Sequence, residues 1–236
     1  MAERLGLGLI PGVGWRASEI RMVARDAEDA GFDAIFTAEV NSDSLAIAQL
    51  MGEATRKIKV GTWVASIHMR HSYACAKAAG LIADGTGGRM ILGLGVSHQP
   101  VNAVLGAEMP SPIAALRRYT NEVASWLRGE GPATHLPQQP APVPVLIYLA
   151  AMTSPTVELA GELADGVMPF MWSAARVERS KAQVGHHLKK EHANSIPYGI
   201  EGVLSTTRAA VGGQAAGCGP AGGSSWMLGG RATPTA

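Results

Sequence analysis

Residues able to transfer protons or bind ligands gather where short apolar runs of this sequence end. Glu39 follows one run, His68 and His71 follow the next, and Ser97 and His98 follow a third. Carboxylates and imidazoles can exchange protons near neutral pH or bind a metal ion. If the runs are parallel strands, their carboxyl ends meet at one edge. We therefore expect a polar site at one rim of the fold.

Simpler roles compete with a site role for several of these residues. Glu39 is also placed to cap the next helix or to pair with Arg70, and His68 and His71 are compatible with ordinary loop positions. A metal site built from these three residues and His98 lacks a spacing that would bring them to one face. We therefore predict no metal site.

The Ser97–His98 pair follows a glycine pattern, and neither completes a known motif. A hydrolase triad lacks an identifiable third member, and adjacent side chains point in different directions. A dinucleotide-binding pattern that starts at Gly93 and Gly95 requires a glycine at position 98, which is histidine. The glycines still allow a flat ligand to approach the backbone, and small residues at 150–154 lead into a helix N-terminus that attracts phosphate. This favours a phosphorylated planar cofactor, with ordinary turn chemistry as the alternative.

The elements that position these residues repeat one unit, an apolar run, a turn and a segment with apolar positions three and four apart. Because the runs are continuous, they predict parallel strands covered on both faces. The expected strands are 5–10, 34–37, 58–65, 90–95, 143–149 and 166–170, with a seventh near 196–204 that Pro197, Gly199 and Gly202 interrupt.

Helical stripes lie between these runs. The first ends at Gly31, which can take a left-handed capping conformation, and the second follows Asn41, Ser42 and Asp43 as candidate N-caps. The expected helices are 20–30, 47–54, 116–127, 154–164, opened by Ser154–Pro155, and 174–190. Residues 129–144 hold five prolines and predict an extended excursion.

Length and composition favour one large barrel domain over two small ones. The chain has 236 residues, of which 47% are hydrophobic and 17% charged, with a net charge of +1. This argues against a disordered chain and against electrostatically driven nucleic-acid binding. No apolar run spans a membrane, and residues 1–4 lack the order of a secretory signal, so we expect a soluble, cytoplasmic protein. Cys75 and Cys218 form no zinc or disulfide spacing.

The last 25 residues differ from the rest. Residues 212–236 carry eight of the 29 glycines and one charge, Arg231, and their composition cannot build a core. We expect a barrel domain over 1–211 and a disordered Gly/Ala-rich tail over 212–236. The barrel is then incomplete at its C-terminus, and a shifted reading frame is our hypothesis for the tail.

Several segments in combination resemble one family. They are 31–33 (GFD) before an acidic strand end, 59–65 (KVGTWVA), Arg70–His71, 87–98 (GGRMILGLGVSH) and 159–166 (LAGELADG). Over roughly residues 4–205 the chain resembles the bacterial luciferase-like monooxygenases, and it is most similar to the branch that uses coenzyme F420, a 5-deazaflavin.

This resemblance implies a TIM-type (β/α)8 barrel that holds the cofactor at its C-terminal rim and passes hydride to or from a small organic substrate. It places a bulge, often with a non-proline cis peptide, behind the cofactor ring at Thr62, Trp63, Val64 and Ala65. It places Val96, Ser97 and His98 along the ring and tail, and Ala151, Met152, Thr153 and Ser154 before the phosphate-binding helix. His98 or Glu39 is then the proton partner.

The chain also departs from this family pattern. Trp63 is bulkier than expected, and His71–Ser72 stands where relatives commonly have Arg-Pro or His-Pro. An FMN-dependent monooxygenase with a partner reductase, binding FMN in place of F420, is one alternative function. A catalytically inactive fragment is another. A homodimer is one possible oligomeric state, which the sequence does not distinguish from a monomer.

Overall fold

The computed structural model describes residues 5–9, 14–170, 172–173, 175–177 and 179–180, together with the backbone of 203–206. All strand pairs are parallel, in the order β7-β6-β5-β3-β2-β1-β8 with β4 beside β5. The strands are β1 Gly6–Leu9, β2 Ala34–Thr37, β3 Lys59–Thr62, β4 Ala65–Ser66, β5 Met90–Gly95, β6 Leu146–Ala151, β7 Gly166–Pro169 and β8 Val203–Thr206.

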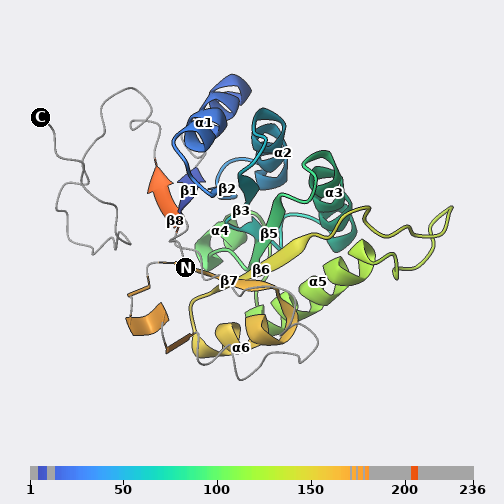
Figure 1. Ribbon diagram of the computed structural model, residues 1–236. Coiled ribbons are helices and arrows are strands. Elements are labelled where there is room, and N and C mark those ends of the chain that lie inside the picture. Colours follow the sequence, from blue (N-terminus) through green and yellow to red (C-terminus); the bar gives the residue numbers. More distant parts are fainter. Residues whose placement is uncertain are drawn as a thin grey trace, which may run out of the picture.

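Helices alternate with these strands, and α1, α2, α3, α5 and α6 cover the outside of the curved sheet, whereas α4 follows the end of β5 (Figure 1). They are α1 Ala17–Asp29, α2 Ser44–Ala54, α3 Ser72–Gly85, α4 Gln99–Val104, α5 Pro112–Leu127 and α6 Ser154–Leu163. This confirms the predicted α/β class as a parallel half-barrel of the TIM type. Within the described residues, no pairing joins β7 to β8, so the sheet is open between them.

The strands are buried on both faces, which explains why their sequences do not alternate. Phe36 and Ile91 belong to an inner cluster that faces the barrel axis, whereas their neighbours Ile35 and Leu92 pack in the layer between sheet and helices. Neighbouring strand residues point to opposite faces, so an apolar residue is needed at every position. The inner cluster consists of Ala34, Phe36, Ile91, Tyr148 and Met168, with Trp63, Val64 and Leu146 packed against it.

Some element boundaries differ from the sequence prediction. The predicted strand 58–65 is split into β3 and β4, and the predicted strand 143–149 is shifted to Leu146–Ala151, since Pro142 and Pro144 have no backbone N–H for a ladder. The N-cap of α6 is Thr153 rather than Ser154, because Thr153 and Thr156 cap each other reciprocally.

Other predictions fall partly outside the described residues. The strand expected near 196–204 is observed as β8 at Val203–Thr206, and the rest of that range lies outside them, as does the tail 212–236 with the boundary at 211. Of the helix expected over 174–190, residues 175–177 and 179–180 are helical. None of the described helices is both long and apolar enough to cross a membrane.

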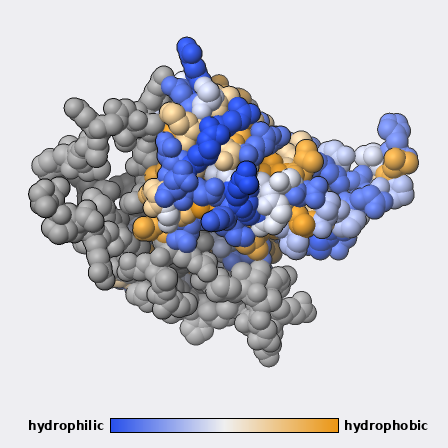
Figure 2. Space-filling model, turned by 45° about the horizontal axis from the view of Figure 1, so that its top comes forward, coloured by the Kyte–Doolittle hydropathy of each residue, from blue (hydrophilic) through white to orange (hydrophobic). Residues whose placement is uncertain are grey.

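The proline-rich segment 129–145 contains no helix or strand and projects from the body, as expected (Figure 1, Figure 2). It is anchored at its base, where the Ala141 N–H donates to the Leu127 carbonyl at 2.7 Å. A cavity of about 190 Å³ lies between this base, α3 and α5.

Arg89 and Glu28 fasten the edge of the sheet at which the strands begin. Arg89 donates to the carbonyls of Gly52, Thr55 and Ile58 at 2.7–2.9 Å, where α2 ends and β3 begins. Glu28 accepts from the backbone N–H groups of 56, 57 and 58 at 2.6–3.1 Å. The turn between α2 and β3 is thus held from both sides by charge-assisted hydrogen bonds.

We expect Arg89→Met to lower the free energy of unfolding by about 3 kcal/mol, because it leaves the three backbone carbonyls without their donor. Arg21→Met is the matched control, since the Arg21–Glu53 pair is exposed and spans 3.4 Å, and it should cost less than about 0.5 kcal/mol. Urea unfolding measures both. Equal losses of unfolding free energy in Arg89→Met and Arg21→Met would contradict the role of Arg89 in holding the turn between α2 and β3.

Glu28 predicts a pH dependence of stability. Burial raises the pKa of Glu28, but the three backbone donors outweigh burial and hold it below its ordinary value of 4.5. The stabilisation is therefore fully present above pH 4.5 and is lost as pH falls through the folded-state pKa. Glu28→Gln should lower stability at pH 7 by less than about 1 kcal/mol. The unfolding free energies of the unmodified protein and of Glu28→Gln should converge at acid pH, and the control Glu108→Gln, at an exposed position, should match the unmodified protein at pH 7.

Candidate functional site at the carboxyl ends of the strands

The strands end at one rim, and this brings together the predicted site residues. Because the sheet is parallel, the segments after β2, β3, β5, β6 and β7 leave from the same edge. These segments carry Glu39, the corner where the chain passes from β3 into β4 (residues 63–66), His98, the start of α6 and Phe170. The sequence prediction that these segments share one edge is confirmed.

The corner between β3 and β4 has the shape implied by the resemblance. The Trp63–Val64 peptide bond is cis without a proline, at the expected position. Both side chains are half-buried and pack against the inner cluster. The Trp63 ring lies 5.7 Å from the Phe170 ring at an angle of 48°. The corner therefore presents apolar and aromatic surface at the rim.

The glycines of β5 make room for this corner. A Cβ at Gly93 would lie 2.5 Å from the Met168 sulfur and still closer to the Thr62 carbonyl oxygen, and one at Gly95 would lie 2.5 Å from Val64 Cγ2. The space beside both glycines is thus filled by the chain itself. Our sequence interpretation gave this space to a flat ligand, whereas here strand-to-strand packing requires the glycines.

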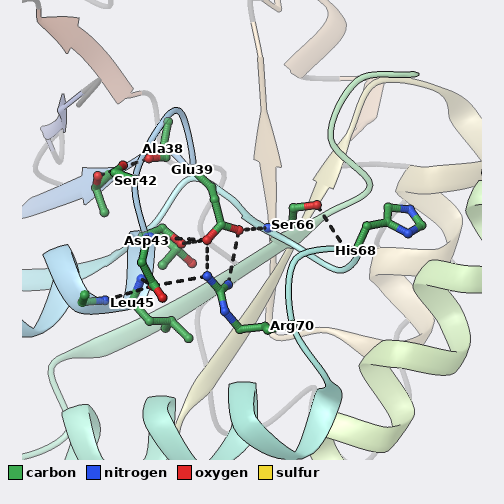
Figure 3. A network of polar contacts seen from close by, with 12 residues as sticks. Ala38, Glu39, Ser42, Asp43, Leu45, Ser66, His68 and Arg70 are labelled. Atoms are coloured by element: carbon green, nitrogen blue, oxygen red, sulfur yellow. Dashed lines mark hydrogen bonds and ion pairs between the residues drawn. The ribbon is translucent and has the colours of Figure 1, made fainter. Parts of the chain in front are cut away.

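Glu39 lies at the centre of a buried polar network (Figure 3). Its Oε2 accepts from the Ser66 backbone N–H at 2.5 Å, and its Oε1 accepts from the Ser44 hydroxyl at 3.2 Å. Both carboxylate oxygens also accept from the two terminal nitrogens of Arg70. The pairing with Arg70, which we gave as an alternative to a site role, is confirmed. The N-cap of α2 is Asp43 rather than Glu39, which accepts from the Ser44 backbone N–H at 3.4 Å.

Arg70 connects this network to two more elements. Its guanidinium lies 3.2 Å from Asp43 Oδ1, and its carbonyl accepts from the Tyr119 hydroxyl at 3.1 Å. Burial lowers the pKa of Arg70, but the Glu39 carboxylate more than reverses this, so the pKa of Arg70 lies above its ordinary value. Burial likewise raises the pKa of Tyr119 and of the neighbouring Cys75, which keeps both neutral. The guanidinium is the permanent cation of this cluster.

His68 and His71, which follow β4, have separate surroundings. His71 caps α3, with its Nδ1 accepting from the Tyr73 N–H at 3.1 Å. His68 points away from Glu39 in Figure 3, and its buried Nε2 has no hydrogen-bond partner. In the part of the chain that the structure describes, no three His, Cys, Asp or Glu side chains are grouped to hold a metal ion.

The segment after β5 presents His98 to solvent. Ser97 has a φ of +61°, a left-handed conformation that is uncommon outside glycine, and it turns the chain into α4. His98 is the exposed N-cap residue of α4, without a side-chain capping bond. Asn102 holds the turn by donating to the Val96 carbonyl at 2.8 Å. The His98 imidazole therefore borders the rim.

The start of α6 is a helix N-terminus with an arginine beside it. Thr156 Oγ1 accepts from the N–H groups of Met152 and Thr153 at 3.0–3.1 Å, and no acidic residue lies in the first turn. Arg176 donates to the Met152 carbonyl, and its guanidinium lies 4.8 Å above the Trp172 ring. Within the described residues, no carboxylate pairs with Arg176.

The comparisons with known proteins identify the family. The family described as luciferase-like monooxygenase matches residues 5–208. The chain belongs to the luciferase-like monooxygenase family. A provisionally named coenzyme F420-dependent oxidoreductase of Mycobacterium tuberculosis is 36% identical over an alignment of 175 residues, and the match covers 62% of this chain and 49% of that protein. The chain thus spans about half the length of the curated relatives it matches.

Solved structures agree on the luciferase-like fold. The coenzyme F420-dependent tetrahydromethanopterin reductase of Methanopyrus kandleri superimposes with a TM-score of 0.66 at 21% identity, covering 87% of this chain and 66% of that one. A type II Baeyer–Villiger monooxygenase of Pseudomonas putida in complex with FMN gives a TM-score of 0.65 at 17% identity, covering 84% and 64%. These likenesses establish the parallel barrel architecture.

Arg176 lies at the rim beside the start of α6, and the sequence prediction did not include it. It lies 24 residues after Met152, in a polar segment whose periodicity indicates only an exposed helix. Its contact with the start of α6 depends on tertiary packing, which no local pattern encodes. Ala151 is buried, whereas Met152, Thr153 and Ser154 are exposed at the rim.

Gly93→Ala should lower the free energy of unfolding by about 2–3 kcal/mol, because the added methyl group meets the Thr62 carbonyl and Met168. Gly85→Ala is the matched control. A Cβ at Gly85 meets nothing within 4 Å, so this change should stabilise the protein by about 0.5 kcal/mol. Thermal or urea unfolding of both variants measures the difference. A neutral Gly93→Ala means that the inner packing at β5 is looser than described.

Proposed function

We propose that this chain is the cofactor-binding part of an oxidoreductase that transfers hydride between coenzyme F420 and a small organic substrate. The observation that carries the proposal is the pairing, at one rim, of an apolar corner with a helix N-terminus free of acidic residues in its first turn. A planar ring fits the first feature and a phosphorylated tail fits the second. The similarity to a relative named for F420 supports this choice.

The residues present fit such a cofactor. Trp63 and Val64 offer apolar contact to a ring, and Arg176 offers a cation beside the start of α6. The hydroxyls of Thr153 and Thr156 lie at the same point and can exchange their internal bonds for bonds to phosphate oxygens. When bound, the deazaflavin supplies the carbon that carries the hydride.

His98 is the residue we assign to proton transfer. Reduction of a carbonyl or imine needs a proton at the substrate heteroatom, and an imidazole can supply it near neutral pH. His98 is exposed at the rim, on the segment after β5. Glu39, the other candidate, has its carboxylate oxygens occupied by donors.

FMN is the second candidate cofactor. It also joins a planar tricyclic ring to a phosphate, and a solved structure of similar fold contains it. The function would then be that of a monooxygenase fed by a partner reductase. Titrating the purified chain with F420 and with FMN separately, followed by fluorescence, decides between them. Binding of F420 alone supports the main proposal, binding of FMN alone supports the second, and binding of neither contradicts both.

His98→Gln should lower turnover about 100-fold. It should leave the dissociation constant of F420 within twofold of the original, because a proton donor acts on the reaction rather than on cofactor binding. His135→Gln is the control, since His135 lies exposed in the projecting segment 129–145 and should change neither quantity. Turnover at saturating F420 measures the effect, and unchanged turnover in His98→Gln removes His98 from this role.

A further inference from the structure

We propose that Glu39 and Arg70 are positioning residues, which hold the corner formed by residues 63–66 in the shape that receives the cofactor ring. This inference deepens the proposed function and rests on it. It assigns Glu39 a role through the corner rather than as a proton donor.

The first observation is the free edge of β4. The ladder between β2 and β3 ends where the Trp63 N–H donates to the Thr37 carbonyl at 2.7 Å. After the corner, β4 pairs with β5 alone among the described strands, through Ala65↔Leu94 and Ser66↔Gly95. A buried backbone N–H needs an acceptor. The Glu39 carboxylate meets this need at Ser66 over 2.5 Å, in the place of a neighbouring strand.

The second observation is that the carboxylate has no capacity left. Oε2 accepts from the Ser66 N–H and from Arg70, and Oε1 accepts from Arg70 and from the Ser44 hydroxyl. An ionised carboxylate has about four acceptor sites. The Glu39 side chain is only 4% exposed, so a substrate cannot replace these donors without breaking the network. This geometry suits an anchor and not a proton shuttle.

The third observation is the reach of Arg70, whose side chain is 13% exposed. Besides Glu39 it contacts Asp43, whose Oδ1 also accepts from the Leu45 N–H at 2.9 Å and so caps α2. Its carbonyl is held by Tyr119 of α5. The pair therefore ties the corner to α2 and α5. Removing Arg70 leaves the buried Glu39 charge without its cation, and removing the Glu39 carboxylate takes the acceptor from the Ser66 N–H and leaves Arg70 with Asp43 alone.

The test compares Glu39→Gln, Arg70→Met and the double variant, with Arg21→Met as a matched control from an exposed ion pair. Each single variant should weaken F420 binding about tenfold, since a loosened site must be ordered on binding. The double variant should be no weaker than either single variant, because both changes break the same pair. At saturating F420, turnover and its pH profile should stay close to those of the unmodified protein.

A proton donor gives a different pattern. If Glu39→Gln abolishes turnover at saturating F420 while Arg70→Met does not, or if the single effects multiply in the double variant, the proposal is overturned. Arg70→Lys keeps the charge but not the paired geometry, and it should recover part of the affinity. It also provides the test if Arg70→Met fails to fold.

A second readout needs no cofactor. Amide hydrogen exchange over residues 62–68 in the unliganded protein should be faster in Glu39→Gln and Arg70→Met than in Arg21→Met. If the unmodified chain binds neither F420 nor FMN but this exchange pattern holds, the proposed function fails while the role of the pair in fixing the corner stands. Unchanged exchange at 62–68 overturns the positioning role, whatever the cofactor result.

Discussion

The hydrogen bond from the Ser66 backbone to Glu39 is the interaction on which the rim depends. The third strand leaves its ladder with β2 at Trp63 and continues as β4 beside β5, so one edge of β4 loses its strand partner. Such a turn is tolerated inside a barrel only if another acceptor satisfies that edge. A carboxylate supplies it here, and the carboxylate in turn requires the buried Arg70 to balance its charge.

The glycines of the sheet are the second half of the same constraint. Strand three can turn inward at the corner only where its neighbour has no side chain, and Gly93 and Gly95 provide that space on β5. Gly61 on β3 likewise leaves room for a neighbouring strand, because a Cβ there would meet the Ile91 backbone and Phe36. Aromatic bulk from Trp63 and Phe36 then fills the axis that the glycines leave open. Small residues on the strands and large residues at the corner are thus complementary.

The fold could be predicted from sequence because strands that are buried on both faces have continuous apolar sequences. These apolar runs located β2, β5 and β7 closely. The shared rim followed from parallel topology alone. The sequence could not decide between a site role for Glu39 and its pairing with Arg70. Both roles require an acidic residue at the end of β2 and a basic residue after β4, so the same residue types fit either one. The shift of β6 and the capping of α6 by Thr153 depend on which backbone groups find partners, and hydropathy does not record this.

Two arginines at the rim illustrate how partners decide a side chain's task. Arg70 faces two carboxylates, Glu39 and Asp43, which neutralise its charge inside the protein. Its guanidinium is therefore poorly suited to bind an anionic ligand. Arg176 contacts a carbonyl and the Trp172 ring, and no carboxylate among the described residues pairs with it. An aromatic face orients a guanidinium without neutralising it. The Arg176 charge, which no described carboxylate neutralises, therefore stands at the start of α6, where an anionic group gains most from it.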